Sequence, residues 1–113
     1  VRRDGEKLAL PREGLACALL AEAEKLQVEL FRRAEASARA RMGEAASIEE
    51  ARALAGSGVA LVPWCGEEEC GHRLEEQVGA NMLGQPQYQS FSPAACAVCG
   101  KVTEKRTYMA RQY

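Results

Sequence analysis

The sequence has few of the residues on which several common functional classes depend. Aromatic residues make up only 5% of the 113 residues, too few for a β-sheet that binds RNA by base stacking. Lys and Arg number 15 against 16 Asp and Glu, and this net charge of −1 argues against a strongly basic nucleic-acid module. No apolar run approaches the ~20 residues of a membrane span, and no signal-peptide core follows the N-terminus. We therefore expect no membrane partner.

Catalytic motifs are also scarce. His72 is the single histidine, so neither a Ser-His-Asp nor a Cys-His arrangement can be argued from the sequence. The sequence contains no glycine-rich loop of the kind that binds phosphate groups. These absences predict a module without an active site of its own.

The rest of the composition is typical of a folded domain. Hydrophobic residues make up 47% and charged residues 27% of a chain long enough for one domain, or for one domain and a fragment of another. Charge is uneven, because residues 57–100 contain one basic and five acidic side chains, whereas residues 101–113 contain four basic and one acidic. The chain opens on Val1 directly before a strand-like segment, so we expect a piece of a longer polypeptide.

The first half of the chain is predicted to be a hairpin followed by two helices. Asp4-Gly5 is a favoured turn pair within residues 1–10. From residue 12 to residue 42, apolar residues recur at steps of three and four, which predicts a long helix packed against a neighbouring element and ended by Gly43. Ser47 and Glu50 form a capping-box pattern that opens a short second helix, closed by residues 56–58.

The second half is predicted to alternate short strands, one helix and a loop. We expect a buried strand over residues 59–62, a helix over residues 72–78, a loop over residues 84–95 and a final strand over residues 101–110. The predicted fold class is therefore α+β (or α/β), with a long N-terminal helix followed by a small domain that contains a short mixed sheet. A metal ion is expected to hold this small domain together.

Five cysteines suggest that metal ion. Four of them form two close pairs, Cys65 with Cys70 and Cys96 with Cys99, separated by 25 residues. Two such pairs are typical of a tetrahedral zinc site, because each pair can direct two thiolates at one point. Four protein ligands leave no open position for water, so the expected zinc ion is structural. Glycine follows three of these cysteines, at positions where we expect sharp turns: Gly66, Gly71 and Gly100.

Other interpretations of these residues remain open at this point. The cysteines could form disulfides, or remain unligated thiols or a redox pair. We interpret Glu67, Glu68 and Glu69 as a solvated turn. His72 could replace a ligand, but is expected on the surface or beside the site. Cys17 lies beside the helical stripe and is interpreted as a small core residue.

Several segments resemble one family closely. They are residues 62–70 and 96–101, which contain the cysteine pairs, and residues 109–113, which end on Tyr113. Together they resemble the C-terminal region of prolyl-tRNA synthetase of the archaeal/eukaryotic-like type. Residues 2–7, 11–15, 30–34 and 79–81 are similar to upstream parts of that region.

The resemblance implies a division at residue 27 and a parent enzyme. Residues 1–27 would be the end of the anticodon-binding domain, and residues 28–113 the C-terminal zinc-binding domain with Cys65, Cys70, Cys96 and Cys99 as ligands. The parent would be a cytoplasmic, homodimeric class II enzyme that activates proline with ATP and Mg²⁺ and charges tRNA(Pro). ATP and Mg²⁺ would bind only to its catalytic domain. The chain alone is predicted to be inactive.

The resemblance also implies a role for Tyr113, which would fold back toward the catalytic domain. The alternative is a frayed, solvated end. Two alternatives to the synthetase remain, namely an independent zinc-ribbon module that binds nucleic acid or protein, and an adaptor that uses the long helix. The excess of acidic side chains in residues 57–100 argues against nucleic-acid binding, since phosphate binding needs basic side chains near the cysteines.

Overall fold

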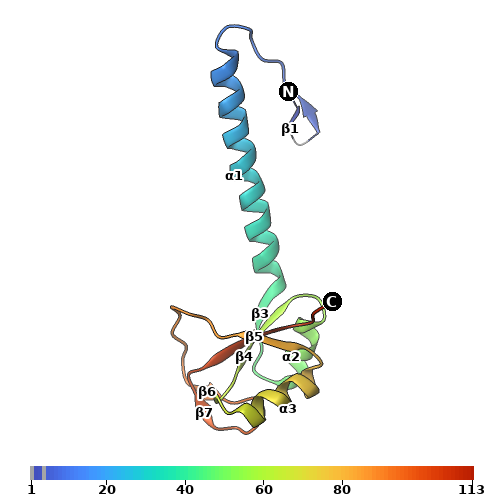
Figure 1. Ribbon diagram of the computed structural model, residues 1–113, viewed down its shortest axis with the longest axis vertical. Coiled ribbons are helices and arrows are strands. Elements are labelled where there is room, and N and C mark those ends of the chain that lie inside the picture. Colours follow the sequence, from blue (N-terminus) through green and yellow to red (C-terminus); the bar gives the residue numbers. More distant parts are fainter. Residues whose placement is uncertain (1, 4) are drawn as a thin grey trace. The chain divides into compact units, whose positions relative to one another are not determined.

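A computed structural model describes residues 2–3 and 5–113 of the chain. The chain divides into two compact units, with bounds at Val1–Ala38 and Arg39–Tyr113 (Figure 1). Among the described residues, no helix has both the length and the apolar character needed to cross a membrane.

The first unit consists of a hairpin and most of one long helix. Strands β1 (Arg2–Arg3) and β2 (Glu6–Lys7) pair in antiparallel fashion, which confirms a hairpin. Of the predicted turn pair, Asp4 lies outside the described residues, whereas Gly5 has a φ of 86°, as such a turn requires. Helix α1 (Leu15–Arg41) confirms the long helix, but it has no buried residues. The predicted packing of its apolar stripe against a neighbouring element is therefore not seen within this chain.

The second unit is built on a four-stranded mixed sheet in the order β3-β4-β8-β5. Strand β4 (Val59–Pro63) is parallel to β3 (Met42–Glu44) and antiparallel to β8 (Arg106–Ala110). Strand β5 (Asn81–Gly84) pairs with the other side of β8. A separate two-stranded ribbon, β6 (Ala94–Ala95) and β7 (Val102–Thr103), lies at the end where β4 finishes and β8 starts.

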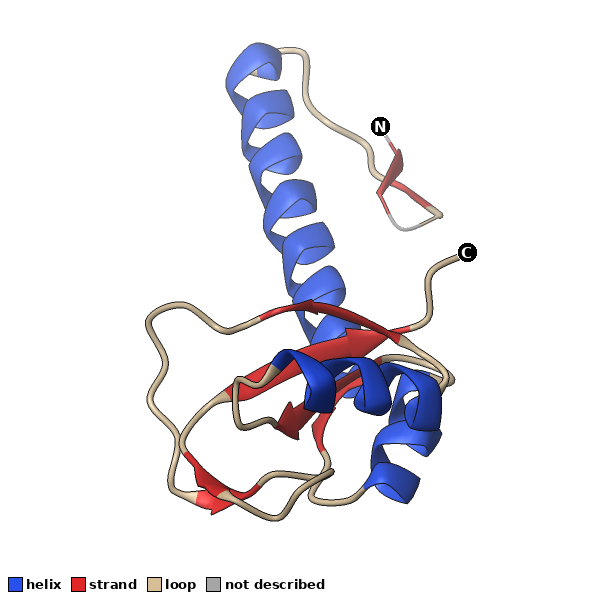
Figure 2. Ribbon diagram, turned by 60° about the horizontal axis from the view of Figure 1, so that its bottom comes forward, coloured by secondary structure: helices blue, strands red, loops and turns tan. Residues whose placement is uncertain are grey.

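Two helices cover one face of this sheet (Figure 2). Helix α2 (Ile48–Ala55) and helix α3 (Glu68–Val78) pack against each other, and they enclose a single core with β4 and β8. The largest fully buried core side chains include Leu74, Met109, Val62 and Val78. Ser47 caps α2 as predicted, since its hydroxyl accepts a hydrogen bond from the Glu50 backbone N–H at 3.3 Å.

The structure corrects several boundaries. Gly43 does not merely end α1, because it lies within β3. Helix α3 begins four residues earlier than predicted, so Glu67, Glu68 and Glu69 form its N-terminus rather than a turn. The predicted final strand is two strands, β7 and β8, separated by a bend at residues 104–105. Strands β3, β5 and β6 were not expected, and β6 lies at the end of the predicted loop over residues 84–95.

Candidate metal centre

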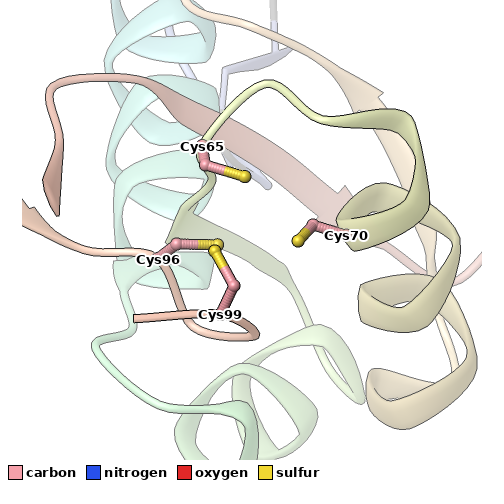
Figure 3. Close-up of side chains that lie close together, drawn as sticks. All are labelled: Cys65, Cys70, Cys96 and Cys99. Atoms are coloured by element: carbon pink, nitrogen blue, oxygen red, sulfur yellow. The ribbon is translucent and has the colours of Figure 1, made fainter. Parts of the chain in front are cut away.

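The four paired cysteines converge on one point. The sulfur atoms of Cys65, Cys70, Cys96 and Cys99 all lie within 4.8 Å of one another. Figure 3 shows the four side chains directed toward a common centre from different segments of the chain. Cys17 lies elsewhere, on α1, and is exposed, so it is not the small core residue that the sequence suggested. The structure therefore brings together the four residues that the sequence singled out and leaves the fifth cysteine apart.

The first pair joins the end of a strand to the start of a helix. Cys65 follows β4, whose buried residues fix its position, and Cys70 lies in the first turn of α3. Gly66 turns the chain between them with a φ of 94°, a conformation that glycine adopts without strain. The indole N–H of Trp64 donates to the Glu67 carbonyl at 3.0 Å and closes this loop. The pair is thus a strand-to-helix junction rather than the tight turn expected from its spacing.

The second pair forms a tight turn between the two strands of the ribbon. The Cys96 N–H donates to the Lys101 carbonyl at 2.8 Å, and the Gly100 N–H donates to the Cys96 carbonyl at 3.0 Å. Gly100 has a φ of 74°, which is the sharp turn predicted there. The Ala97 N–H donates to the Pro63 carbonyl at 3.1 Å, so the second pair is anchored to the strand that positions the first.

Gly71 has a different role from the one predicted. It lies within α3 rather than in a turn. A β-carbon at this position would approach the Met82 sulfur to 3.3 Å and the Trp64 indole nitrogen to 3.7 Å. Glycine therefore allows α3 to pack closely on the neighbouring chain.

The bend between β7 and β8 is hydrogen-bonded to Trp64, the residue just before the first cysteine loop (residues 65–70). The Thr103 hydroxyl donates to the Trp64 carbonyl at 3.1 Å and accepts from the Lys105 N–H at 3.0 Å. The Trp64 N–H in turn donates to the Lys105 carbonyl at 3.2 Å. We refer to these three hydrogen bonds as the Thr103 clasp. Sequence reasoning missed it, because the only signal was a threonine far along the chain.

The thiol groups strongly influence one another's ionisation. Burial, with the adjacent Cys65 and Cys99 thiols, raises the pKa of Cys70 to about 12. Burial also raises the pKa of Cys65. Burial opposes ionisation of Cys96 as well, but the backbone amides of Cys99, Val98 and Cys65 outweigh it and lower the pKa of Cys96 to about 7. One thiolate therefore forms readily, whereas four together require a cation.

The arrangement fits a tetrahedral metal ion. With metal–sulfur bonds of ~2.3 Å, the sulfurs of such a site stand about 3.8 Å apart, and the observed cluster is compatible with that separation. All five cysteines are free thiols, so the disulfide interpretation is not supported. Amide groups directed at the Cys96 sulfur supply the hydrogen bonds that thiolate ligands usually receive. The residues present can therefore hold a soft divalent cation.

The other predicted site residues lie outside the cluster. His72 is exposed on α3, as expected for a surface residue, and its Nε2 atom lies 3.6 Å from the Glu68 Oε1 atom. Glu69 forms an ion pair with Arg73 at 2.7 Å. Tyr113 is fully exposed within this chain.

Comparison with known proteins identifies the family. The family described as "Prolyl-tRNA synthetase, C-terminal" matches residues 48–113. A proline–tRNA ligase from Methanothrix thermoacetophila is 50% identical over 114 residues, which cover 100% of this chain and 24% of that protein. The chain belongs to the prolyl-tRNA synthetase family. A proline–tRNA ligase from Methanococcoides burtonii is 37% identical, with 99% of this chain and 24% of that protein covered.

Solved synthetase structures share the fold. Prolyl-tRNA synthetase from Cryptosporidium parvum, complexed with L-proline and AMP, gives a TM-score of 0.81 at 20% identity, with 100% of this chain and 25% of that chain covered. The Giardia lamblia enzyme, in complex with prolyl-adenylate, gives 0.75 at 21% identity, with 85% and 20% covered. The chain spans about a quarter of the length of the curated relatives it matches.

Proposed function

We propose that this chain is a noncatalytic C-terminal part of a proline–tRNA ligase, in which it holds a structural zinc ion. The observation behind this proposal is the convergence of four cysteine sulfurs in a chain whose relatives are proline–tRNA ligases. In this proposal the complete enzyme activates proline with ATP and Mg²⁺ and charges tRNA(Pro), as a cytoplasmic homodimer. Those reactions take place in other domains, and the chain alone is inactive.

Zinc is the proposed metal because of the donor set. Soft thiolates favour zinc over magnesium or calcium, which prefer oxygen ligands. Four thiolates also fill a tetrahedral coordination shell, so the ion stabilises the fold and has no open position for a reactant. Here it would join the end of β4, the start of α3 and the turn between β6 and β7.

We also propose a division of the chain, on the basis of its resemblance to this family. Residues 1–27 are proposed to be the end of the anticodon-binding domain, and residues 28–113 the zinc-binding domain. The remaining synthetase domains are the proposed partners of α1, whose exposed apolar side chains include Leu20, Val28 and Phe31. Tyr113 is proposed to pack toward the catalytic domain.

Metal analysis of the purified chain tests the zinc proposal. We expect about one zinc ion per chain, and we expect Cys99→Ser to lose it. Removal of zinc should lower the Tm by more than about 10 °C, since structural zinc contributes several kcal/mol to folding and 1 kcal/mol shifts the Tm of a small domain by about 4–8 °C. Elemental analysis and a thermal melt with chelator provide the measurements.

Cys17→Ser is the matched control, because it removes a thiol that lies outside the cluster. It should keep both the zinc content and the Tm of the wild-type chain. A wild-type chain that contains no metal, or a Cys17 variant that loses as much metal as Cys99→Ser, contradicts the proposal.

A further inference from the structure

We propose that Lys105 is an electrostatic partner of the four-cysteine centre, whose ammonium group offsets the negative charge of the metal–thiolate cluster and so strengthens metal binding. This inference rests on the proposed function, because it concerns the zinc ion assigned there. It adds a positioning residue that is not a ligand.

The Lys105 side chain lies directly over the first cysteine loop. Its Nζ atom is 2.6 Å from the point where a β-carbon would stand on Gly66, and its Cδ and Cε atoms are 3.3 and 3.5 Å from that point. Gly66 immediately follows Cys65. The lysine therefore occupies the space that a side chain at position 66 would fill, and its ammonium group lies next to the residue that follows Cys65 in the sequence.

The backbone of Lys105 is fixed at the same place. The Thr103 clasp bonds the N–H of Lys105 to the Thr103 hydroxyl and the carbonyl of Lys105 to the Trp64 N–H. Trp64 immediately precedes Cys65. Lys105 thus reaches the loop through both its backbone and its side chain, although the residue is exposed to solvent.

The centre has a charge that needs such a partner. One divalent ion with four thiolates has a net charge of about −2. Glu67, Glu68 and Glu69 lie between Cys65 and Cys70 in the sequence and add negative charge nearby. Two other cations of this unit are already committed, because Arg73 pairs with Glu69, and the Arg106 guanidinium donates to the Ser92 carbonyl. Lys105, by contrast, lies against the loop that joins Cys65 to Cys70.

The size of the effect follows from the exposure of the ammonium group. An exposed ion pair contributes little, but a doubly charged cluster increases that contribution, so loss of the charge should weaken zinc binding about threefold to tenfold. Because the group is exposed, salt should screen the effect. Packing of the lysine stem over Gly66 would show no such salt dependence.

Zinc affinity of the full chain, measured by competition with a chromophoric chelator, tests the proposal. Lys105→Met keeps most of the stem and removes the charge, so it should bind zinc about threefold to tenfold more weakly at low salt and almost normally in ~1 M salt. Lys105→Arg keeps the charge and should restore most of the affinity. Arg111→Gln is the control for net charge, because Arg111 follows the opposite end of β8 from Lys105.

The outcomes separate this inference from the proposed function. If the wild-type chain binds no zinc, both the proposed function and this inference are wrong. If the wild-type chain binds one zinc ion and Lys105→Met binds it with unchanged affinity, only the role of Lys105 is wrong. A loss that persists in high salt, or that appears equally in Arg111→Gln, assigns the effect to packing or to overall charge and also overturns the inference.

Discussion

Gly58 lies at the start of β4, where the chain passes the end of α1 and leaves no room for a side chain. A β-carbon on Gly58 would stand 1.9 Å from the carbonyl oxygen of Arg41 and 2.9 Å from its carbonyl carbon. The obstacle is backbone rather than a flexible side chain, so relief requires movement of α1 or β4. Its own N–H donates to the Leu54 carbonyl at 2.9 Å, which opposes that movement.

Gly58→Ala should therefore destabilise the second unit. We expect a loss of about 1–3 kcal/mol in the free energy of unfolding, the usual cost of overpacking. Gly56→Ala is the matched control, because its nearest neighbour would be the Ala53 carbonyl at an ordinary 3.4 Å and its φ of −65° suits alanine. Denaturant unfolding of both variants measures the difference. Equal stability of the two would contradict the predicted clash.

The ion pairs of Glu29 stabilise α1 to an extent that depends on pH. Its carboxylate accepts hydrogen bonds from the Arg32 Nε and Nη2 atoms, each at 2.9 Å, and from the Arg33 Nε atom at 2.8 Å. These bonds, those from Arg32 above all, lower the pKa of Glu29 from 4.5 to about 2. The folded pKa lies below the unfolded one, so the interaction stabilises α1 fully above about pH 4.5 and is lost as the pH falls toward 2.

An NMR titration of the Glu29 side chain checks this prediction. The midpoint should lie near pH 2 in the wild-type chain and should rise toward 4.5 in Arg32→Met. Arg41→Met, which removes a cation from the last turn of the same helix, should leave the midpoint unchanged. A wild-type midpoint near 4.5 would mean that these ion pairs do not persist in solution.

At the scale of elements, the sequence predicted those structures whose signals are local. The 3.6-residue period predicts α1, the Ser47 and Glu50 pair predicts the start of α2, and a run of apolar residues predicts β4. All three were found. The start of α3 was missed because Cys70 and Gly71 suggested a turn, whereas packing against Met82 and Trp64 favours a helix there.

Elements that depend on distant partners could not be predicted in this way. Strands β3 and β5 are short and contain few apolar residues in alternation, and each exists because a neighbouring strand pairs with it. The bend that divides β7 from β8 is likewise fixed by the Thr103 clasp to Trp64. At the candidate site, the paired spacing predicted which four cysteines come together. The positions of Thr103 and Lys105 beside them depend on tertiary contacts and could not be predicted.

At the scale of the whole molecule, the chain presents a folded second unit and an exposed helix. Helix α1 buries no residue here, and Phe31 is 71% exposed. Apolar side chains exposed in this way commonly mark surfaces that bind other protein. The relatives are about four times as long as the matched region, which agrees with the proposal that other synthetase domains cover α1.

Tyr113 provides the test of that larger assembly. Within this chain its side chain is fully exposed, on a segment that follows β8 directly. If it packs toward the catalytic domain, its deletion from the complete ligase should lower proline-dependent ATP–pyrophosphate exchange by about tenfold, which corresponds to ~1.4 kcal/mol. The zinc content should not change, because the cysteines lie at the other end of β8.

Two variants of the complete ligase make this test specific. Tyr113→Phe keeps the ring and should retain most of the exchange activity. Tyr88→Ala removes another fully exposed tyrosine, from the loop between β5 and β6, and should have no effect. Unchanged exchange after deletion of Tyr113 would identify this residue as a solvated end. Lost exchange together with lost zinc would instead mean that the deletion unfolds the domain, because β8 pairs with both β4 and β5 and its disruption would separate the cysteine loops.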